Sequence, residues 1–267
     1  LDVRLASTDT TAYAASLDGN VYSLNLEAGA GSFASIGKHE KGVKAIVCND
    51  SSVFSGSWDK YVKQWDPRAP GKEVGTYYQG GRVFSMSASP SNHKLVVATS
   101  AKTLQIFDTR SMQETPLESR ESPLKYPIRT VACMPNGKEG RVALEYFEQE
   151  DQELKYAFKC HRKHDDSVQG GEIIYPVNAI AFHPVHGTFA SGGCDGVVSM
   201  WDGQHKKRIK QLPAYSSSIA ALDFNCTGEL LAVASSYTFE EGEKDHPPDS
   251  IYVREMTHAE TAPKVKK

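Results

Sequence analysis

The sequence predicts an all-β protein built from repeated four-stranded sheets, and three observations lead to this fold class. First, residues 56–66 (GSWDKYVKQWD) end on a Trp-Asp pair, and the same pattern returns at residues 192–202 (GGCDGVVSMWD), 136 residues later. Second, the turn positions of successive copies lie 41 and 42 residues apart. Third, each copy alternates apolar and polar residues, which indicates half-buried strands. A period of about 40–45 residues is typical of WD-type blades, so we predict a WD40 β-propeller.

Weaker copies of the motif support the repeat. They occupy residues 16–26 (SLDGNVYSLNL), 100–108 (SAKTLQIFD), 140–146 (GRVALEY) and 249–254 (DSIYVR). In several copies a small residue and a two-residue turn precede the alternating stretch, and Asp-Gly pairs such as Asp18-Gly19 supply the positive φ that tight hairpins require. We therefore expect each motif to be the turn and third strand of a blade. Because one blade cannot bury both of its faces, the blades must stack radially.

Six blade-like segments follow from this spacing. The first spans residues 1–38, with strands near 3–6, 12–16, 21–26 and 33–36. The second spans 39–78, the third 79–118 with its inner strand at 83–88, the fifth 177–212 and the sixth 219–256. We expect one propeller domain over residues 1–256, followed by a polar, basic tail over residues 257–267.

Two places depart from a regular seven-bladed ring. The fourth segment begins after Arg120, with an inner strand expected at 130–134, but the sequence then passes to residue 140 without room for a middle strand. Leu1 is expected to lie inside an innermost strand, which suggests that a first blade is missing upstream. Because propellers commonly close by pairing strands from the two termini, ring closure is an open question.

Composition narrows the possible functions. The chain has 267 residues, 39% hydrophobic and 24% charged, which is enough to bury a sizeable core. Its net charge of −3 excludes a global basic field of the kind that drives nonspecific nucleic-acid binding. No apolar run is long enough to span a membrane. The cysteines form no C-x-x-C pair, and we expect them to be reduced and buried; they are Cys48, Cys133, Cys160, Cys194 and Cys226.

Longer motifs resemble the Bub/Rae family of WD-repeat adaptors over about residues 16–264. They are residues 120–126 (RESPLKY), 139–145 (EGRVALE), 155–162 (KYAFKCHR), 174–182 (IYPVNAIAF), 192–208 (GGCDGVVSMWDGQHKKR) and 231–244 (LAVASSYTFEEGEK). Residues 56–70 and 201–208 favour the spindle-checkpoint branch, whereas RESPLKY is shared with, or slightly closer to, the messenger-RNA export branch. The resemblance implies a seven-bladed, non-enzymatic adaptor without a cofactor.

The same resemblance implies particular partners. Family members bind the GLEBS motif, found in checkpoint kinases and their pseudokinase relatives, across the top face of the propeller. Checkpoint members also bind phosphorylated Met-Glu-Leu-Thr repeats of a kinetochore scaffold, and ubiquitin is a further expected ligand. No direct nucleic-acid or membrane binding is expected. The implied locations are the nucleus, the kinetochore in mitosis and the cytoplasm, and the alternative function is a nuclear-pore messenger-RNA export adaptor.

Five residues carry the expected sites. By resemblance, Trp58 of GSWD and Arg162 of KCHR match peptide-binding positions, and Arg141 of EGRV is a further one. Lys207 matches a phosphate-contacting position, and Arg208 belongs to the same basic cluster. The peptide-contacting Trp that the family carries in its upstream blade is absent from this sequence.

The chemistry of these residues is compatible with binding, although structural roles remain open. Trp58 stands where the other strong copy has Cys194, so the repeat does not require an indole there, and we expect it to be exposed on a rim. Trp and Arg dominate interface energies. The alternatives are that Trp58 covers its own blade, that Arg162, expected near a strand end, pairs within the chain, and that the basic cluster is a solvated turn.

Catalytic and metal sites are weaker alternatives. Cys160-His161 with His164, and His183 with His186, have metal-ligand-like spacing, but neither set has a matching second half. Residues 183–187 are typical of the hairpin between the first two strands of a blade. The sequence contains no Gly-rich phosphate loop and no G-x-S-x-G elbow. The acidic run 240–245 is expected to be a surface loop.

Overall fold

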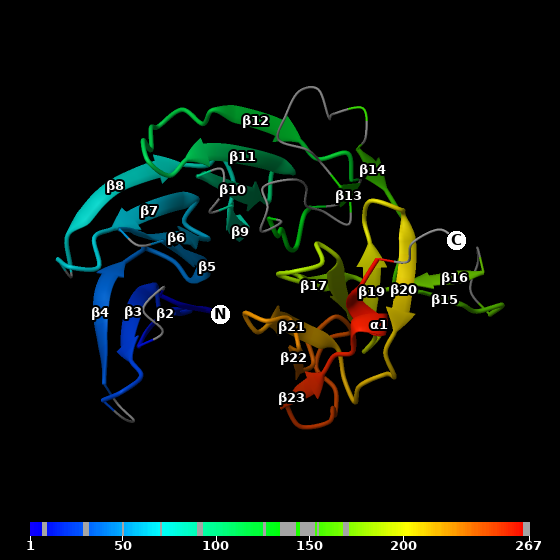
Figure 1. Ribbon diagram of the computed structural model, residues 1–267. Helices are drawn as coiled ribbons and strands as arrows, with labels where there is room; N and C mark the ends of the chain where they lie inside the picture. The colour runs from blue at the N-terminus through cyan, green and yellow to red at the C-terminus, as the bar shows by residue number, and fades with distance from the viewer. Residues whose placement is uncertain are drawn as a thin grey trace. The chain divides into compact units, whose positions relative to one another are not determined.

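The computed structural model describes residues 1–6, 10–28, 32–49, 51–69, 71–89, 93–124, 127–133, 143–144, 153, 155–167 and 171–263. The chain divides into two compact units, Leu1–Val131 and Ala132–Lys267. Within the described ranges there are 23 strands and one short helix (Figure 1). The predicted all-β WD40 β-propeller fold is confirmed.

The first blade is a four-stranded antiparallel sheet in chain order. Its strands are β1 (Asp2–Leu5), β2 (Thr11–Ala15), β3 (Asn20–Asn25) and β4 (Phe33–Lys38). These bounds agree with the predicted strands to within two residues. The alternation of small and apolar residues in β2 and β3 therefore predicts the positions of these two strands correctly.

The second and third blades are also four-stranded meanders. The second consists of β5 (Val43–Cys48), β6 (Val53–Ser57), β7 (Tyr61–Trp65) and β8 (Glu73–Tyr78). The third consists of β9 (Val83–Ser89), β10 (Lys94–Thr99), β11 (Thr103–Asp108) and β12 (Glu118–Glu121). Inner strands of neighbouring blades pack together, with β1 and β2 against β5, and β5 and β6 against β9.

The small residue of each strong motif has a packing role. A Cβ atom at Gly56 would lie 2.6 Å from Cγ1 of Val83 in the next blade, and one at Gly192 would lie 2.4 Å from Cγ2 of Ile219. Both distances are too short for a side chain without rearrangement. The glycine therefore permits the close approach between blades that buries their faces.

The tight turns adopt the expected backbone. Gly19 and Gly196 have φ angles of 88° and 72°. At the corresponding turns of the second and third blades, Lys60 and Lys102 take φ values of 79° and 61°. The left-handed conformation thus belongs to the turn itself, and glycine is the residue that adopts it at least cost.

The second unit contains two further blades. The fifth predicted segment forms β17 (Val177–Phe182), β18 (Phe189–Gly193), β19 (Val198–Asp202) and β20 (Lys207–Gln211). The sixth forms three strands, β21 (Ile219–Phe224), β22 (Leu230–Ser235) and β23 (Ser250–Glu255). Strands β17 and β18 pack against β21, over a core that includes Met200, Ile219 and Leu231. The short helix α1 (His258–Thr261) follows β23.

The fourth segment differs from the prediction. In its described residues it forms two antiparallel strand pairs, β13 (Ala143–Leu144) with β14 (Tyr156–Ala157), and β15 (Arg162–His164) with β16 (Glu172–Ile174). The inner strand expected at 130–134 is wrong for its described part, residues 130–133. There the Val131 amide donates to Ser85 Oγ of β9, at 3.0 Å.

The described part of the chain thus contains five sheets of three or four strands, instead of six blades. All five cysteines are free. Cys194 is buried and three others are partly buried, but Cys226 is exposed in the turn between β21 and β22, so its expected burial is wrong. Burial raises the pKa of the Cys160 thiol to about 12, which leaves it unreactive. Among the described residues, no helix has the length and apolar character needed to cross a bilayer.

Candidate peptide and phosphate sites

A fixed turn connects β19 to β20 and carries the basic cluster. The buried Asp202 carboxylate accepts a hydrogen bond from the His205 amide at 3.0 Å and lies 2.7 Å from His205 Nδ1. The Tyr156 hydroxyl donates to the carbonyl of Gly203 at 2.6 Å. Lys206 closes the turn with a φ of 55°. The backbone that presents Lys206 and Lys207 is therefore held from both sides.

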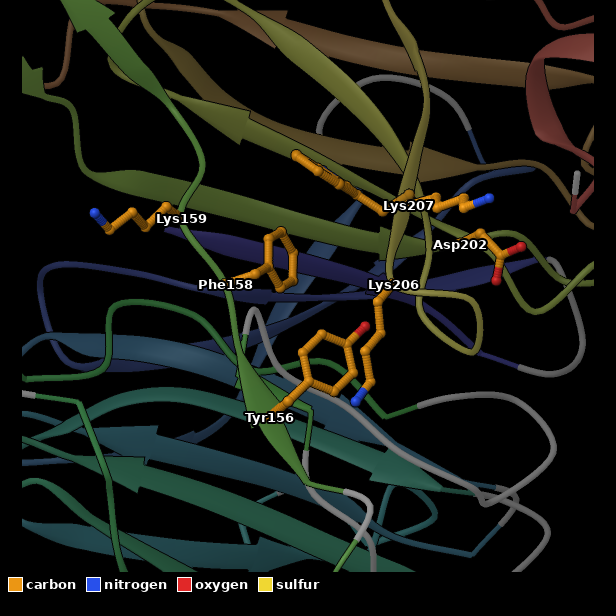
Figure 2. A pocket seen from close by; sticks show the side chains of 7 residues that line it. Tyr156, Phe158, Lys159, Asp202, Lys206 and Lys207 are labelled. Carbon is orange, nitrogen blue, oxygen red and sulfur yellow. The ribbon is translucent and has the colours of Figure 1, made fainter.

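A pocket of about 250 Å³ lies beside this turn (Figure 2). It is lined by Tyr156, Phe158, Lys159, Trp201, Asp202, Lys206 and Lys207. The rings of Phe158 and Trp201 have centroids 4.7 Å apart, and Lys206 Nζ lies 4.5 Å from the centroid of Tyr156. The pocket therefore combines an aromatic trough with three lysines, a composition that suits an anionic group next to an apolar one.

The two predicted phosphate residues have different surroundings. Lys207 lines the pocket and pairs with Asp202 across the sheet, whereas Arg208 pairs with Trp201 and lies with its guanidinium carbon 6.0 Å from the centroid of that ring, which also lines the pocket. Because successive residues of a strand face opposite sides, the two side chains diverge. The sequence prediction missed Tyr156, Phe158 and Lys159. Their signal was the alternation of aromatic and basic residues in KYAFKCHR, whose contact with a tryptophan some forty residues further along cannot be derived from local pattern.

Trp58 lies in the turn between β6 and β7 and is partly buried, although we expected an exposed indole. Its amide donates to the carbonyl of Gly42 at 3.0 Å. A Cβ atom on Gly42 would lie 3.3 Å from Leu17 Cδ2 and 3.4 Å from Trp58 Cε3, so both side chains lie close to Gly42. Its Nε1 atom is buried without a hydrogen-bond partner among the described residues.

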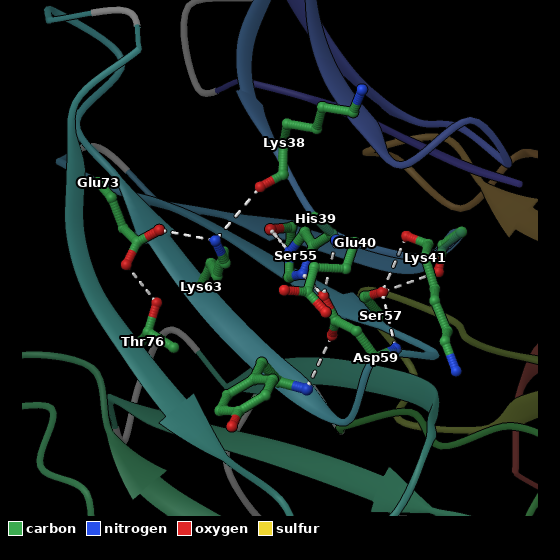
Figure 3. Close-up of polar contacts among 12 residues, drawn as sticks. Lys38, His39, Glu40, Lys41, Ser55, Ser57, Asp59, Lys63, Glu73 and Thr76 are labelled. Carbon is green, nitrogen blue, oxygen red and sulfur yellow. Dashed lines mark hydrogen bonds and ion pairs between the residues drawn. The ribbon is translucent and has the colours of Figure 1, made fainter.

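A buried polar network fixes the turn that carries Trp58 (Figure 3). His39 Nδ1 lies 2.8 Å from an Asp59 carboxylate oxygen, and His39 Nε2 lies 2.7 Å from Ser55 Oγ. Trp65 Nε1 donates to the same hydroxyl at 2.7 Å. The network thus links the Trp-Asp strand to the Trp58-Asp59 turn.

The fifth blade, formed by β17 to β20, repeats this network. His161 Nδ1 lies 2.9 Å from Asp195, His161 Nε2 lies 2.8 Å from Ser191 Oγ, and Trp201 Nε1 donates to Ser191 Oγ at 2.8 Å. His161 is therefore a structural residue. No group of three or more His, Cys, Asp or Glu side chains suited to a metal ion occurs among the described residues.

Arg162 opens strand β15, directly after the buried His161. Its Nη1 atom donates to Glu172 Oε2 at 2.7 Å, across the β15–β16 pair. The guanidinium holds the pKa of Glu172 below its usual range. The intramolecular ion pair, which the sequence left open, is present, and the arginine remains on the surface. The other expected peptide residue, Arg141, lies outside the described residues.

The meandering sheets, their Asp-containing turns and the two buried networks together define a WD40 β-propeller protein. The family model described as "WD domain, G-beta repeat" matches residues 32–66 and 171–202.

Relatives narrow this class to one family. The chain is 52% identical to "Mitotic checkpoint protein BUB3.1" of Arabidopsis thaliana, over 86% of this chain and 71% of the relative. It is 40% identical to "Mitotic checkpoint protein bub-3" of Caenorhabditis elegans, over 93% of this chain and 75% of the relative. It is also 32% identical to "mRNA export factor GLE2" of Chaetomium thermophilum, over 81% of this chain and 62% of the relative. The chain belongs to the Bub3 family of mitotic checkpoint WD40 proteins.

Proposed function

We propose that this chain is a non-enzymatic spindle-assembly-checkpoint adaptor that holds GLEBS-type segments of a checkpoint kinase or its pseudokinase relative. It docks that complex on phosphorylated Met-Glu-Leu-Thr repeats of a kinetochore scaffold, within the nucleus and at mitotic kinetochores. The observation that carries the proposal is the pocket whose lining combines the rings of Tyr156, Phe158 and Trp201 with three lysines, Lys159, Lys206 and Lys207, and one carboxylate, Asp202 (Figure 2).

The pocket suits a phosphorylated threonine next to apolar residues. A phosphate carries close to two negative charges at neutral pH and several acceptor oxygens. Lysine ammonium groups neutralise this charge, and Lys206 is already fixed against Tyr156. The Met and Leu side chains of the repeat would contact the trough formed by Phe158 and Trp201. The unphosphorylated repeat would lack the charge that the lysines attract.

For the GLEBS segment, the proposed contacts are Trp58, Arg162 and Arg141. The unsatisfied Nε1–H group of Trp58 is a donor that a peptide carbonyl would accept. Arg162 would exchange Glu172 for a carboxylate of the peptide, which is feasible because the existing ion pair lies on the surface. The peptide would thus supply the hydrogen bond that Trp58 lacks and an ion pair in place of the one between Arg162 and Glu172.

The alternative is the messenger-RNA export adaptor. The identity to the export factor, 32%, is lower than the 52% identity to a checkpoint protein, which favours the checkpoint assignment.

A pull-down with purified protein separates the two assignments. Extract from mitotic cells is passed over the immobilised chain and over a Trp58→Ala variant as a matched control. We expect recovery of checkpoint kinases carrying GLEBS segments on the original protein, with reduced recovery on the variant. Preferential recovery of a nucleoporin would instead support the export assignment.

A further inference from the structure

Three imidazole rings meet where α1 joins the fifth blade. His183 and His186 belong to the turn between β17 and β18, and His258 belongs to α1. The rings of His183 and His186 are stacked, with centroids 4.3 Å apart and an interplanar angle of 9°. His258 meets His186 edge-on, at 5.0 Å and 85°. Neither the proposed peptide sites nor the propeller networks account for this cluster.

His183 is held in its neutral form by its hydrogen bonds. Its ring is buried and its Nδ1 atom accepts hydrogen bonds from the amides of Val185 and His186, at 3.2 and 3.1 Å. A protonated Nδ1 has no lone pair to offer these donors. On its other sides the ring faces Phe224 of β21 and Gly228 of the following turn. Protonation of His183 at Nδ1 would therefore break both hydrogen bonds of the turn.

His186 attaches α1 to the blade. Its Nδ1 atom lies 3.1 Å from Thr261 Oγ1, and the buried Thr188 hydroxyl donates to the Thr261 carbonyl at 2.6 Å. On the other side of the helix, Arg254 donates to Glu260 at 2.9 Å. The groups facing His186 are therefore His183 from its own turn and His258 and Thr261 from α1. The Arg254–Glu260 ion pair joins β23 to α1, while Arg254 Nε has no hydrogen-bond partner among the described residues.

The attachment point lies at the end of the blade that carries Lys207. Thr188 leads directly into β18, where Phe189 pairs with Trp201, and the next pair along the sheet joins Asp202 to Lys207. Helix α1 also packs against β20. Movement of α1 would therefore change the packing of β20, the strand on which Lys207 and Arg208 lie.

Protonation opposes the attachment. Burial lowers the pKa of both His183 and His186, and the second cause is another histidine in each case: His186 on His183, and His258 on His186. Hydrogen bonds to Gly228 and to Thr261 raise these two pKa values and oppose the shift in part. A histidine whose folded pKa is lowered leaves docking intact above its ordinary pKa of about 6.5, and weakens it as the pH falls below that value.

We propose that the stack of His183, His186 and His258 is a proton-sensitive latch that holds α1 on the fifth blade and releases it when a second ring becomes charged. Release frees the end of β20 and, resting on the phosphate role proposed for Lys207, lowers affinity for the phosphorylated repeat. The latch itself does not depend on that role.

Hydrogen exchange of the intact chain tests the latch. After correction for the intrinsic rate, we expect the amides of residues 257–262 to exchange about tenfold faster at about pH 5.5 than at about pH 7.5. His186→Asn keeps a polar group near Thr261 but cannot titrate, so its exchange should not depend on pH. His258→Gln should reduce the pH effect several-fold, and His246→Gln, an exposed histidine of another loop, should leave it unchanged.

Two results would overturn the latch: equal protection of residues 257–262 at both pH values, or the same pH effect in His258→Gln as in the original chain. The phosphate consequence is measured separately, by comparing repeat affinity of the original chain and His258→Gln at about pH 5.5. Tighter binding by the variant is expected. If Lys207 does not bind phosphate, the affinities will be equal while the exchange difference persists, which distinguishes the two failures.

Discussion

The indole of Trp58 keeps a buried N–H group that has no acceptor among the described residues. A buried donor left unsatisfied costs about 1–3 kcal/mol, so such a group is seldom retained without a use. Its counterpart in the fifth blade is the buried Cys194, which does not carry this cost. We propose that the carbonyl group of a bound peptide accepts a hydrogen bond from this N–H group.

Replacing Trp58 by Ala should weaken GLEBS peptide binding by about 2 kcal/mol or more, because both the ring and the donor are lost. Trp58→Phe keeps an apolar ring and loses the donor, so it should cost about 0.5–1.5 kcal/mol. Titration calorimetry measures both values. Unchanged affinity in Trp58→Ala would remove this residue from the site.

At the phosphate site, Lys207→Glu should abolish the preference for phosphorylated over unphosphorylated threonine repeats, because it places a negative charge in the pocket. Lys210→Glu makes the same charge change further along β20, outside the pocket lining, and is the matched control. GLEBS binding should be retained in both variants. Fluorescence anisotropy with both forms of the repeat measures the preference, and equal effects of the two substitutions would indicate a nonspecific field.

At the scale of elements, each strong motif is stabilised by a network that ties a turn to a strand. In the second blade the side chains of His39 and Asp59 are 0% and 4% exposed. Burial alone would raise the pKa of Asp59, but hydrogen bonds from His39 and from the amides of Tyr61 and Glu40 lower it overall. A carboxyl with a lowered pKa stabilises the fold above its ordinary value of about 3.9 and loses this contribution as the pH falls through the lowered pKa.

Asp59→Asn should therefore lower the free energy of unfolding by about 1–3 kcal/mol at neutral pH. Its stability should also fall less steeply than that of the original chain below about pH 4. Urea unfolding followed by circular dichroism at several pH values provides the comparison. Asp249→Asn, in an exposed loop, is the control and should behave like the original chain; an identical acid profile in Asp59→Asn would contradict this role.

Blade stacking is tested at Gly192, where a Cβ atom would lie 2.4 Å from Ile219 Cγ2. Gly192→Ala should lower the free energy of unfolding by about 1–3 kcal/mol, because the neighbouring blade must move. Ile219→Ala removes the Cγ2 methyl group, which makes the shortest of these contacts, and leaves the Cβ atom of residue 219 at 2.8 Å. The double variant should then lose at least about 1 kcal/mol less than the sum of the single variants. Strict additivity would show that the contact does not limit stacking.

The sequence predicts these elements well where the pattern is local. The Asp-Gly turns of the first and fifth blades, and the alternating strands of the first, second and fifth blades, follow from neighbouring residues. The prediction of an inner strand in the fourth segment fails because a strand needs a backbone partner, whereas the Val131 amide donates to the Ser85 side chain of another blade. The burial of Trp58 and the pairing of Arg162 with Glu172 depend on register between segments, which the spacing of the repeat does not encode.

At the scale of the whole molecule, the proposed contacts divide between the two compact units. Trp58 belongs to the first unit, and Lys207 and Arg162 belong to the second. An adaptor of the proposed kind must bind the kinase segment and the phosphorylated repeat together, because its function is to bring one to the other. The central claim is therefore simultaneous occupancy.

Calorimetry of the phosphorylated Met-Glu-Leu-Thr repeat with the chain already saturated by a GLEBS peptide measures this occupancy directly. We expect one repeat bound per chain, with an affinity no weaker than that of the peptide-free protein and at least tenfold above that of the unphosphorylated repeat, a difference of about 1.4 kcal/mol. Loss of repeat binding in the saturated protein, or equal affinity for both forms of the repeat, would contradict it.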